Sequence, residues 1–424
     1  MILDSLLAFG LLLATATQLR FGETPFGPGE MCLVVWLLLF LCRQVVGQGP
    51  RANAAFTHVF AFWLILIVAE SIGAIVGFTT ESFFDTSNMV HDITAYSFLF
   101  GVACALALEL ASEHRRRRVT WLIALFGAAS LSLQLAHAYG LVPLPIPADP
   151  WIYFSITNGS RLRGWSEDPN QLGLVAALLT WISIHVADTA TARMKVITAI
   201  VCAVLALTVG RLTQSDSFTV GILAAGAVFL LIKSALWLGT FKRGVTFRAA
   251  LASLALLGLP VLAVDAIPLG PVAVERVEAK SKAIYDEDNQ GDARFHLWAE
   301  AFDKGMRAAM LGLGPGPHLT KAKAWKRSPP VKFESHDTPL ELFTRGGLLA
   351  LLAVAWLYTS LLLATVKAKL PALAALSCAI VVFSMFHFII RHPIFWFGVV
   401  LCLLEAASVS KLSFGGKRAD MARL

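Results

Sequence analysis

Apolar residues in this chain occur in blocks of about 17–25 residues, the length that an α-helix needs to cross the hydrocarbon core of a bilayer. Charged residues make up only 15% of the 424 positions, against about 25% in ordinary soluble domains. A transmembrane barrel would show alternating rather than continuous hydrophobicity. These features exclude a soluble enzyme, a disordered chain and a fibrous protein, and they predict an all-α, polytopic membrane protein.

The apolar blocks predict about twelve transmembrane helices. They fall near 2–19, 29–46, 55–78, 90–111, 118–138, 171–187, 194–210, 217–237, 247–267, 340–365, 371–389 and 393–410. The first block has no basic segment before it, so we expect a membrane span rather than a cleavable signal peptide. The six cysteines all lie within apolar blocks, which gives no indication of a disulfide framework.

Lysine and arginine residues are distributed unequally between the two sets of connections. Eighteen lie at the ends of spans two, four, six, eight and ten or in the C-terminal tail. Only five lie in the short connections on the other side: Arg20, Arg161, Arg163, Arg211 and Arg391. Because basic residues accumulate in the cytoplasm, we expect both termini there. The net charge of +7 reflects this topology and does not indicate a nucleic-acid partner.

The four arginines at 115–118 are interpreted as a topology anchor, with a lipid-phosphate site as the alternative. Two segments on the non-cytoplasmic side are long, at about 139–170 and 268–339. The second holds eleven basic and ten acidic residues and is predicted to form a helical subdomain between spans nine and ten. The chain is thus expected to divide into 1–267 with nine spans, the loop 268–339, and 340–424 with three spans and a cytoplasmic tail.

Within the large loop, apolar residues at helical spacing predict an amphipathic helix over 293–311. The apolar positions are Phe295, Trp298, Phe302, Met306 and Met310. Such a helix lies either at the membrane interface or packed against the transmembrane bundle, and the pattern supports both equally. Arg294 and His296 stand at its start, where charged residues are usually just solvated.

Two arginines precede the sixth predicted span. Arg161 and Arg163 are followed by a Pro-Asn turn, in which Asn170 is a candidate N-cap. Because a helix N-terminus carries free N–H groups, arginines beside it form a natural anion site. On this segment alone, the simpler interpretation is a capped helix whose arginines face lipid headgroups.

Arg211 follows the seventh span, on the side where topology does not favour positive charge. An arginine at the end of an apolar run is costly unless it is paired, solvated or able to extend to the interface. A functional role and simple snorkelling are equally supported by this pattern.

His336 lies immediately before the tenth predicted span. Its imidazole can accept a proton from a hydroxyl near neutral pH, and Glu334, Asp337 or Glu341 are spaced to orient the ring. The alternative is a histidine that only satisfies a helix cap.

Metal-binding patterns in the chain are weak. Residues 286–291 imitate part of a calcium loop, but Gln290 and Leu297 stand where ligands are needed. Asp286 and Asp288 suggest a metal–diphosphate site, although one such pair is common in a charged loop. Because no histidine pair has zinc spacing either, we expect no metal and no other cofactor.

Four stretches, taken in order, resemble the O-antigen ligase and repeat-unit polymerase superfamily of bacterial integral-membrane glycosyltransferases. They are RGWSEDPNQL at 163–172, RLTQSDS at 211–217, RFHLW at 294–298 with LGPG at 313–316, and SHDTPLEL at 335–342 with GGL at 346–348. Each stretch is degenerate, but their joint order over about 160–350 is fairly specific.

The resemblance implies a GT-C-like fold in the bacterial inner membrane, with the active site formed by the periplasmic loop and neighbouring spans. It implies an inverting, metal-independent glycosyltransferase that takes a glycan from undecaprenyl diphosphate. The acceptor would be a hydroxyl on another lipid-linked glycan or on lipid A-core. By position, the family's general base falls on His336. Its diphosphate-binding arginines fall on Arg211 and Arg294, with Arg161 or Arg163 as further candidates.

The chain departs from the ligase pattern at two positions. Asp337 stands where Asn, Ser or Gln usually follows the histidine, and Leu349 stands where a small or polar residue is common. The stretch DPNQL at 168–172 is more similar to exopolysaccharide-type polymerases. Both a polymerase and a ligase acting on lipid A-core therefore stay open.

Three other protein classes compete with this interpretation. A twelve-span secondary transporter usually has its main loop between two six-span halves, and it carries charged residues inside its spans, which are scarce here. A membrane O-acyltransferase would use His336 but would leave the arginines unexplained. A non-catalytic lipid flippase or scaffold is the third alternative.

Overall fold

The computed structural model describes residues 2–21, 26–47, 50–81, 85–142, 156–158, 161–240, 290–320 and 332–421. Side chains are described throughout these ranges except at 157–158, 239–240, 290–294, 320 and 410–421. The ninth predicted span, 247–267, lies outside the described residues, as do 268–289 and 321–331 of the predicted loop subdomain.

The described chain is built from helices, with two short β-hairpins at one end. The helices are α1 (Ile2–Leu13), η1 (Thr17–Leu19), α2 (Pro28–Val45), α3 (Ala54–Thr80), α4 (Thr86–Glu109), α5 (Glu113–Ala138), α6 (Pro169–Thr189), α7 (Arg193–Leu212), α8 (Asp216–Thr240), α11 (Gln290–Arg307), α12 (Thr338–Lys367), α13 (Pro371–Ser384) and α14 (Pro393–Met421). The hairpins pair β1 (Thr157–Asn158) with β2 (Arg161–Leu162), and β3 (Leu319–Thr320) with β4 (Lys332–Phe333).

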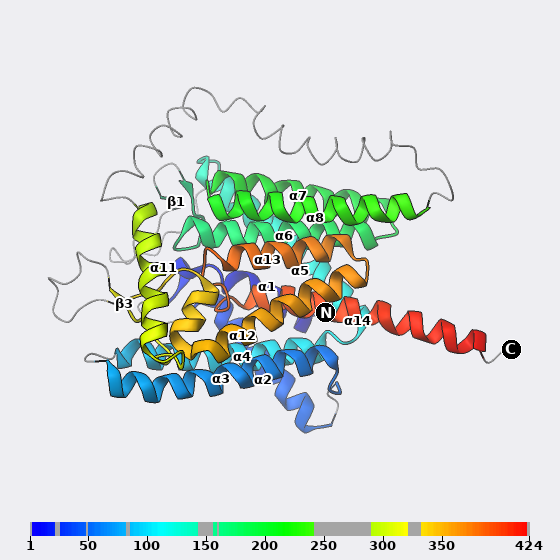
Figure 1. The fold of residues 1–424 in the computed structure, drawn as a ribbon. Coiled ribbons are helices and arrows are strands. Elements are labelled where there is room, and N and C mark those ends of the chain that lie inside the picture. The colour runs from blue at the N-terminus through cyan, green and yellow to red at the C-terminus, as the bar shows by residue number, and fades with distance from the viewer. Residues whose placement is uncertain are drawn as a thin grey trace.

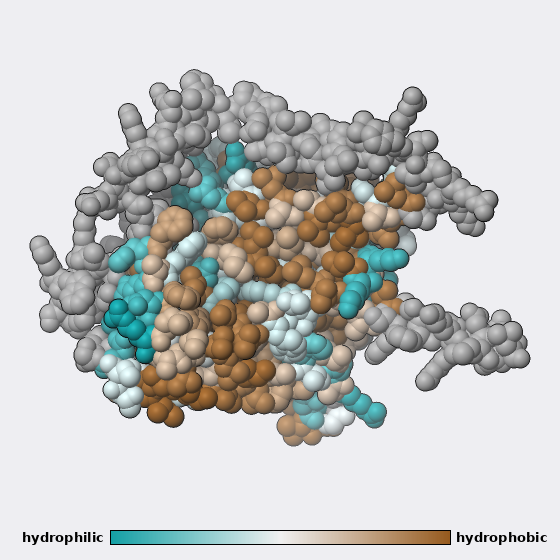
Figure 2. All heavy atoms as spheres, viewed as in Figure 1, coloured by the Kyte–Doolittle hydropathy of each residue, from teal (hydrophilic) through white to brown (hydrophobic). Residues whose placement is uncertain are grey.

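Among the described residues, eight helices are long and apolar enough to cross a membrane, namely α2 to α8 and α12. The apolar parts of α1, α13 and α14 are shorter. Figure 2 shows apolar side chains covering the flank of this bundle, with hydrophilic residues gathered toward its ends. The expectation of an all-α, polytopic membrane protein is confirmed.

Side-chain oxygens begin several of these helices by accepting a hydrogen bond from the first turn. Asn53 accepts from Phe56 at the start of α3, and Asp85 accepts from Asn88 at the start of α4. Asp168, not Asn170, is the N-cap of α6, because Pro169 already occupies the first helical position. The prediction that Asn170 caps this helix was therefore wrong.

Large aromatic side chains fill the core where α3, α4 and α14 meet. Trp63 contacts Trp396 with ring centroids 4.9 Å apart and Tyr96 at 5.9 Å, and Phe62 also packs on Trp396 at 5.4 Å. All four side chains are buried. Their packing fixes α4 against the helices that flank it, and α4 carries two residues of the site described below.

The two ends of the bundle differ. Figure 1 shows α11 running across one end, together with β1 and β3, while the chain termini lie toward the other end. We call the end that carries α11 and the two hairpins the loop end.

The arginine run at 115–118 lies at the opposite end and makes ion pairs across several helices. Arg115 pairs with Asp4 of α1 at 2.8 Å, and buried Arg116 pairs with Glu405 of α14 at 2.7 Å. The run therefore ties α5 to its neighbours, a role that its interpretation as a topology anchor did not include.

Candidate functional site

His336 occupies the turn between β4 and α12 at the loop end. Its backbone has a φ of +56°, in the left-handed region that is strained for a residue with a Cβ. Its side chain is exposed, and the imidazole has no hydrogen-bond partner among the described residues. The ring is therefore available to exchange a proton with a bound molecule.

The residue before this histidine is held on several sides. The N–H and hydroxyl of Ser335 both donate to the Glu341 carboxylate, over 2.7 and 2.9 Å. The Ser335 carbonyl accepts from the indole N–H of Trp298 on α11 at 3.0 Å. Ser335 and Glu341 are almost completely buried. The backbone leading into His336 is thus fixed from both α11 and α12.

The residue after the histidine caps α12. The Asp337 carboxylate accepts from the N–H of Leu340 at 2.8 Å, and the side chain is buried. Burial raises the pKa of Asp337 to about 6, although the hydrogen bond from Leu340 acts in the opposite direction. Both neighbours of His336 are therefore buried and hydrogen-bonded, while the histidine itself points outward.

A buried ion network lies next to this turn. Arg345, with no exposed surface, donates to Glu341 at 2.7 Å, to Asp92 at 2.6 Å and to Glu334 at 3.1 Å. It also donates to the hydroxyl of Tyr96 at 2.9 Å. A guanidinium this deeply buried needs partners for its donors, and each of its three nitrogens donates at least one hydrogen bond to these four residues.

Arg391, in the connection between α13 and α14, shares two of these carboxylates. It pairs with Glu334 and, at 3.2 Å, with Asp92. The guanidinium carbons of Arg391 and Arg345 each lie 4.7 Å from the ring centroid of Phe388. The network therefore joins α4, α12, the His336 turn and the connection after α13.

The predicted arginines of the other cluster lie where α6 begins and α7 ends. Arg161 is half-buried and donates to the carbonyl of Thr213 at 2.9 Å and to the Asn170 side chain at 3.0 Å. Arg211 is exposed at the end of α7, and its guanidinium makes no hydrogen bond or ion pair within the described part of the chain. Arg163 stands one residue beyond β2 and is half-buried.

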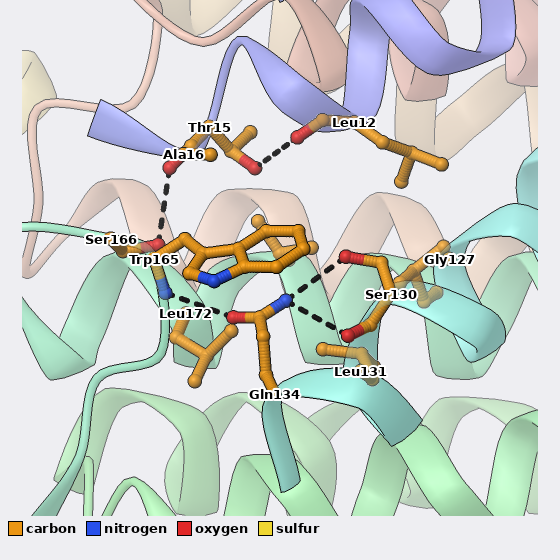
Figure 3. A pocket seen from close by; sticks show the side chains of 12 residues that line it. Leu12, Thr15, Ala16, Gly127, Ser130, Leu131, Gln134, Trp165, Ser166 and Leu172 are labelled. Atoms are coloured by element: carbon orange, nitrogen blue, oxygen red, sulfur yellow. Dashed lines mark hydrogen bonds between the residues drawn. The ribbon is translucent and has the colours of Figure 1, made fainter. Parts of the chain in front are cut away.

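The segment that follows these arginines is held by the chain after α1. Gln18 donates to the carbonyls of Gly164 and Ser166, each at 2.7 Å, and the Ser166 hydroxyl donates to Thr15. A small pocket lies beside it, between α1, α5 and α6, where Gln134 accepts from the N–H of Trp165 (Figure 3). None of the predicted site residues lines this pocket, so we regard it as support for the segment rather than as a substrate site.

Helix α11 packs against the His336 turn and against the end of α3. Leu297 and Ala301 are buried, and Lys304 donates to Glu81 at 3.4 Å and to the carbonyl of His318 at 2.6 Å. The backbone of Arg294 lies in this helix, but its side chain is outside the description, so its predicted role remains a prediction.

Much of the apolar face expected for this helix is exposed. The side chains of Phe295, Phe302, Met306 and Met310 are between 42% and 68% exposed. One face of the helix therefore packs on the bundle, as one of the two alternatives expected. An apolar edge stays uncovered by protein in the described chain, and a position at the membrane interface stays a prediction.

The two clusters lie at the same end of the molecule, on either side of α13. Figure 1 shows α13 between α6 and α12. The connection after α13 contacts the cluster around His336, because the hydroxyl of Thr338, at the start of α12, donates to the carbonyl of His387 in that connection at 2.6 Å. The structure thus brings together two separate sets of predicted residues. One set is Arg161 and Asn170 with the end of α7, and the other is His336 with Asp337 and Glu334.

Four residues of the histidine cluster were not anticipated from the sequence: Asp92, Tyr96, Arg345 and Arg391. A usable signal was present, since Asp92 and Arg345 are charged residues within apolar helices, and such residues mark functional or paired positions. The sequence does not reveal that they pair with each other, because they are 253 positions apart.

A comparison with protein families finds a match over part of the chain that includes this site. Residues 200–355 match the family described as O-Antigen ligase. The matched range runs from α7 to α12 and includes Arg211, Arg294 and His336, whereas Arg161, Arg163 and Arg391 lie outside it. The match confirms the resemblance to the O-antigen ligase and polymerase superfamily and supports a function of that general type. No curated protein matches the chain.

Proposed function

We propose that this protein is an inverting, metal-independent glycosyltransferase. In this proposal it transfers a glycan from undecaprenyl diphosphate to an acceptor hydroxyl on the periplasmic side of the bacterial inner membrane. The observation that carries the proposal is His336, an exposed imidazole without a described partner, on a rigid turn inside the matched range. Exposed Arg211, at the end of α7, supplies a positive charge that has no partner among the described residues.

The proposed reaction divides between the two clusters. The acceptor hydroxyl gives its proton to an imidazole nitrogen of His336 while its oxygen attacks the anomeric carbon of the donor sugar. The bond between that carbon and the diphosphate oxygen breaks, and the diphosphate leaves with the electron pair. Because attack comes from the face opposite the leaving group, the anomeric configuration inverts.

The charges near each cluster favour this division. The histidine side contains three carboxylates, on Asp92, Glu334 and Glu341, and two guanidinium groups already engaged with them. A diphosphate gains little there. The side of Arg161, Arg163 and Arg211 offers planar donor groups that match phosphate oxygens. We therefore assign the donor diphosphate to the arginine side, with Arg294 as a further candidate, and the acceptor hydroxyl to His336.

The decisive experiment uses the purified full-length protein with a polyprenyl-diphosphate oligosaccharide. Release of polyprenyl diphosphate is measured for the wild type, His336→Asn and His336→Ala. Asparagine tolerates the left-handed backbone better than alanine, so His336→Asn removes the imidazole while keeping the turn. We expect both variants to lose about 10²–10⁴-fold in turnover. Wild-type turnover in folded His336→Asn would refute the general base.

Chelation provides a second test of the same proposal. EDTA is expected to leave turnover unchanged, because the arginines supply the charge that a metal would otherwise provide. Strong inhibition that magnesium reverses would instead favour Asp286 and Asp288 as metal ligands.

Two acceptors fit this chemistry. The family description favours a ligase that transfers to lipid A-core, while the DPNQL stretch at 168–172 favours a polymerase that extends a second lipid-linked glycan. Deletion of the gene in its host distinguishes them. Loss of polymer with single repeats retained indicates a polymerase, and polymer that is made but not attached to lipid A-core indicates a ligase. Transport of glycan without polyprenyl diphosphate release in proteoliposomes would favour a transporter instead.

A further inference from the structure

Arg345 has no exposed surface and donates hydrogen bonds to Glu334, in the chain just before His336, and to Glu341, which holds Ser335. We propose that Arg345 is a positioning residue that holds His336 in its working orientation by fixing Glu341 and Glu334. This inference rests on the proposed function, because it assumes that His336 is the base. Nothing in the sequence motifs assigns Arg345 a role.

The first path from Arg345 to the histidine runs through Glu341. Arg345 Nε donates to Glu341 Oε1 at 2.7 Å, and the other oxygen of that carboxylate, Oε2, accepts both the N–H and the hydroxyl of Ser335. The arginine thus orients the carboxylate, and the carboxylate holds the residue that precedes His336. Each of these three residues is at most 1% exposed, so water cannot replace the lost bonds easily.

The second path fixes the turn relative to the bundle. Arg345 Nη2 donates to Glu334, two residues before the histidine, and Nη1 donates to Asp92 and Tyr96 on α4. The backbone carbonyl of Arg345 also accepts from the N–H of Gly314 at 2.8 Å. One side chain therefore connects the turn to a helix that is distant in sequence.

The backbone of His336 gives the reason why such a clamp is needed. A φ of +56° is unfavourable for histidine and persists only where the surroundings enforce it. The bonds to Ser335 and Asp337 provide that enforcement on both sides. If Ser335 were released, the turn would relax toward an ordinary backbone conformation and the imidazole would point elsewhere.

The test compares Ser335→Ala and Arg345→Lys with His336→Asn in the polyprenyl-diphosphate release assay. Ser335→Ala removes the hydroxyl bonds with a minimal change of volume. Arg345→Lys keeps the charge but cannot bridge three carboxylates. We expect kcat to fall by about 10- to 100-fold in both variants, with the KM for the donor unchanged, because the base is misplaced while the diphosphate site is intact.

Arg116→Lys is the matched control. Arg116 is also a buried, ion-paired arginine, 1% exposed, but it lies at the opposite end of the bundle with Glu405 and Ser408. It should lower thermal stability without changing kcat per folded molecule. A role of Arg345 in stability alone would give this same pattern.

The possible outcomes separate the two proposals. Loss of kcat in Ser335→Ala and Arg345→Lys, with donor KM kept, supports the positioning role. Wild-type kcat in folded Ser335→Ala overturns it, even if Arg345→Lys does not fold. Wild-type activity in His336→Asn would overturn the proposed function itself, whatever the other variants do.

Discussion

At the scale of single residues, four arginines at the loop end differ in how far their guanidinium groups are already bound by other residues. Arg161 donates to Thr213 and Asn170, and Arg391 is shared between two carboxylates. Arg345 donates hydrogen bonds from all three of its guanidinium nitrogens. Arg211 alone among these four has an exposed guanidinium without a partner in the described chain. An arginine that is already satisfied gains less from a phosphate, so Arg211 is the best candidate for a contact that forms only on binding.

Replacing Arg211 with alanine should therefore lower kcat/KM for the donor. The loss of one hydrogen bond to a charged group corresponds to about 10- to 100-fold. Arg193→Ala is the control, because Arg193 is exposed at the other end of the same helix. Both variants should express and melt like the wild type. Equal kcat/KM in the two variants would remove Arg211 from the diphosphate site.

Asp337 predicts a pH dependence of stability. Its pKa is raised from 3.8 to about 6 by burial, so the fold favours the protonated form. The resulting stabilisation is complete below about pH 4 and is lost as the pH rises to about 6. Asp337→Asn keeps an N-cap of equal quality without the charge. We expect the variant to match the wild type at pH 4 and to be more stable at pH 7, by at most about 3 kcal/mol.

The measurement is thermal unfolding in detergent at several pH values between 4 and 7. The wild-type and Asp337→Asn curves should diverge over this window. Parallel curves would mean that the carboxylate is better solvated than its burial indicates.

At this scale, sequence analysis identifies residues that stand out by a local pattern, but not residues whose role comes from a tertiary contact. His336 and Arg211 were identified because each lies at the end of an apolar block, which is a local pattern. The partners of Arg345 were not, because Asp92 and Tyr96 belong to a helix whose relation to α12 is set by tertiary packing. The cap of α6 was misassigned by two residues, since Asp and Asn are equally good caps and the Pro decides between them.

At the scale of elements, α12 is the most informative helix. The sequence predicted one continuous span over 340–365, but the helix is interrupted at Gly347, whose φ is +63°. The chain at Met310 fills the break, because the N–H of Leu348 donates to the Met310 carbonyl at 2.8 Å. The short first part of α12, which carries Glu341 and Arg345, is thereby separated from the part that crosses the membrane. Nothing local marks this break, because glycine is frequent in unbroken transmembrane helices.

Gly347→Ala should destabilise the protein strongly. A Cβ at this position would lie 2.0 Å from the Met310 carbonyl oxygen, on backbone that cannot move aside easily, and the left-handed φ adds strain. We expect a loss of about 2–4 kcal/mol in unfolding free energy, measured by thermal unfolding in detergent. The control is Gly226→Ala on α8, where a Cβ has open space and no loss is expected. Equal melting temperatures for the two variants would contradict the interruption of α12.

At the scale of the whole molecule, the two candidate clusters and the arginine run at 115–118 occupy opposite ends. The loop end carries both candidate clusters, whereas the arginine run at 115–118 and the connections near it lie at the other end. The helical architecture and this asymmetry were predictable from the sequence, because apolar block length and lysine and arginine counts depend on composition alone. The arrangement of helices around α13 was not, since it depends on which side chains fit together.

The asymmetry also predicts which end faces the periplasm. Basic residues are retained in the cytoplasm, so the loop end should face outward, as the proposed chemistry requires. The test starts from a variant in which the six native cysteines are replaced by alanine. A single cysteine is then introduced either at Glu167, which is exposed at the loop end, or at Arg117, which is exposed at the other end. A membrane-impermeant maleimide should label Glu167→Cys in cells whose outer membrane alone is permeabilised. Arg117→Cys should react only after the inner membrane is opened as well. The reverse pattern would put His336 and Arg211 in the cytoplasm, where a donor that is handled at the outer leaflet could not reach them.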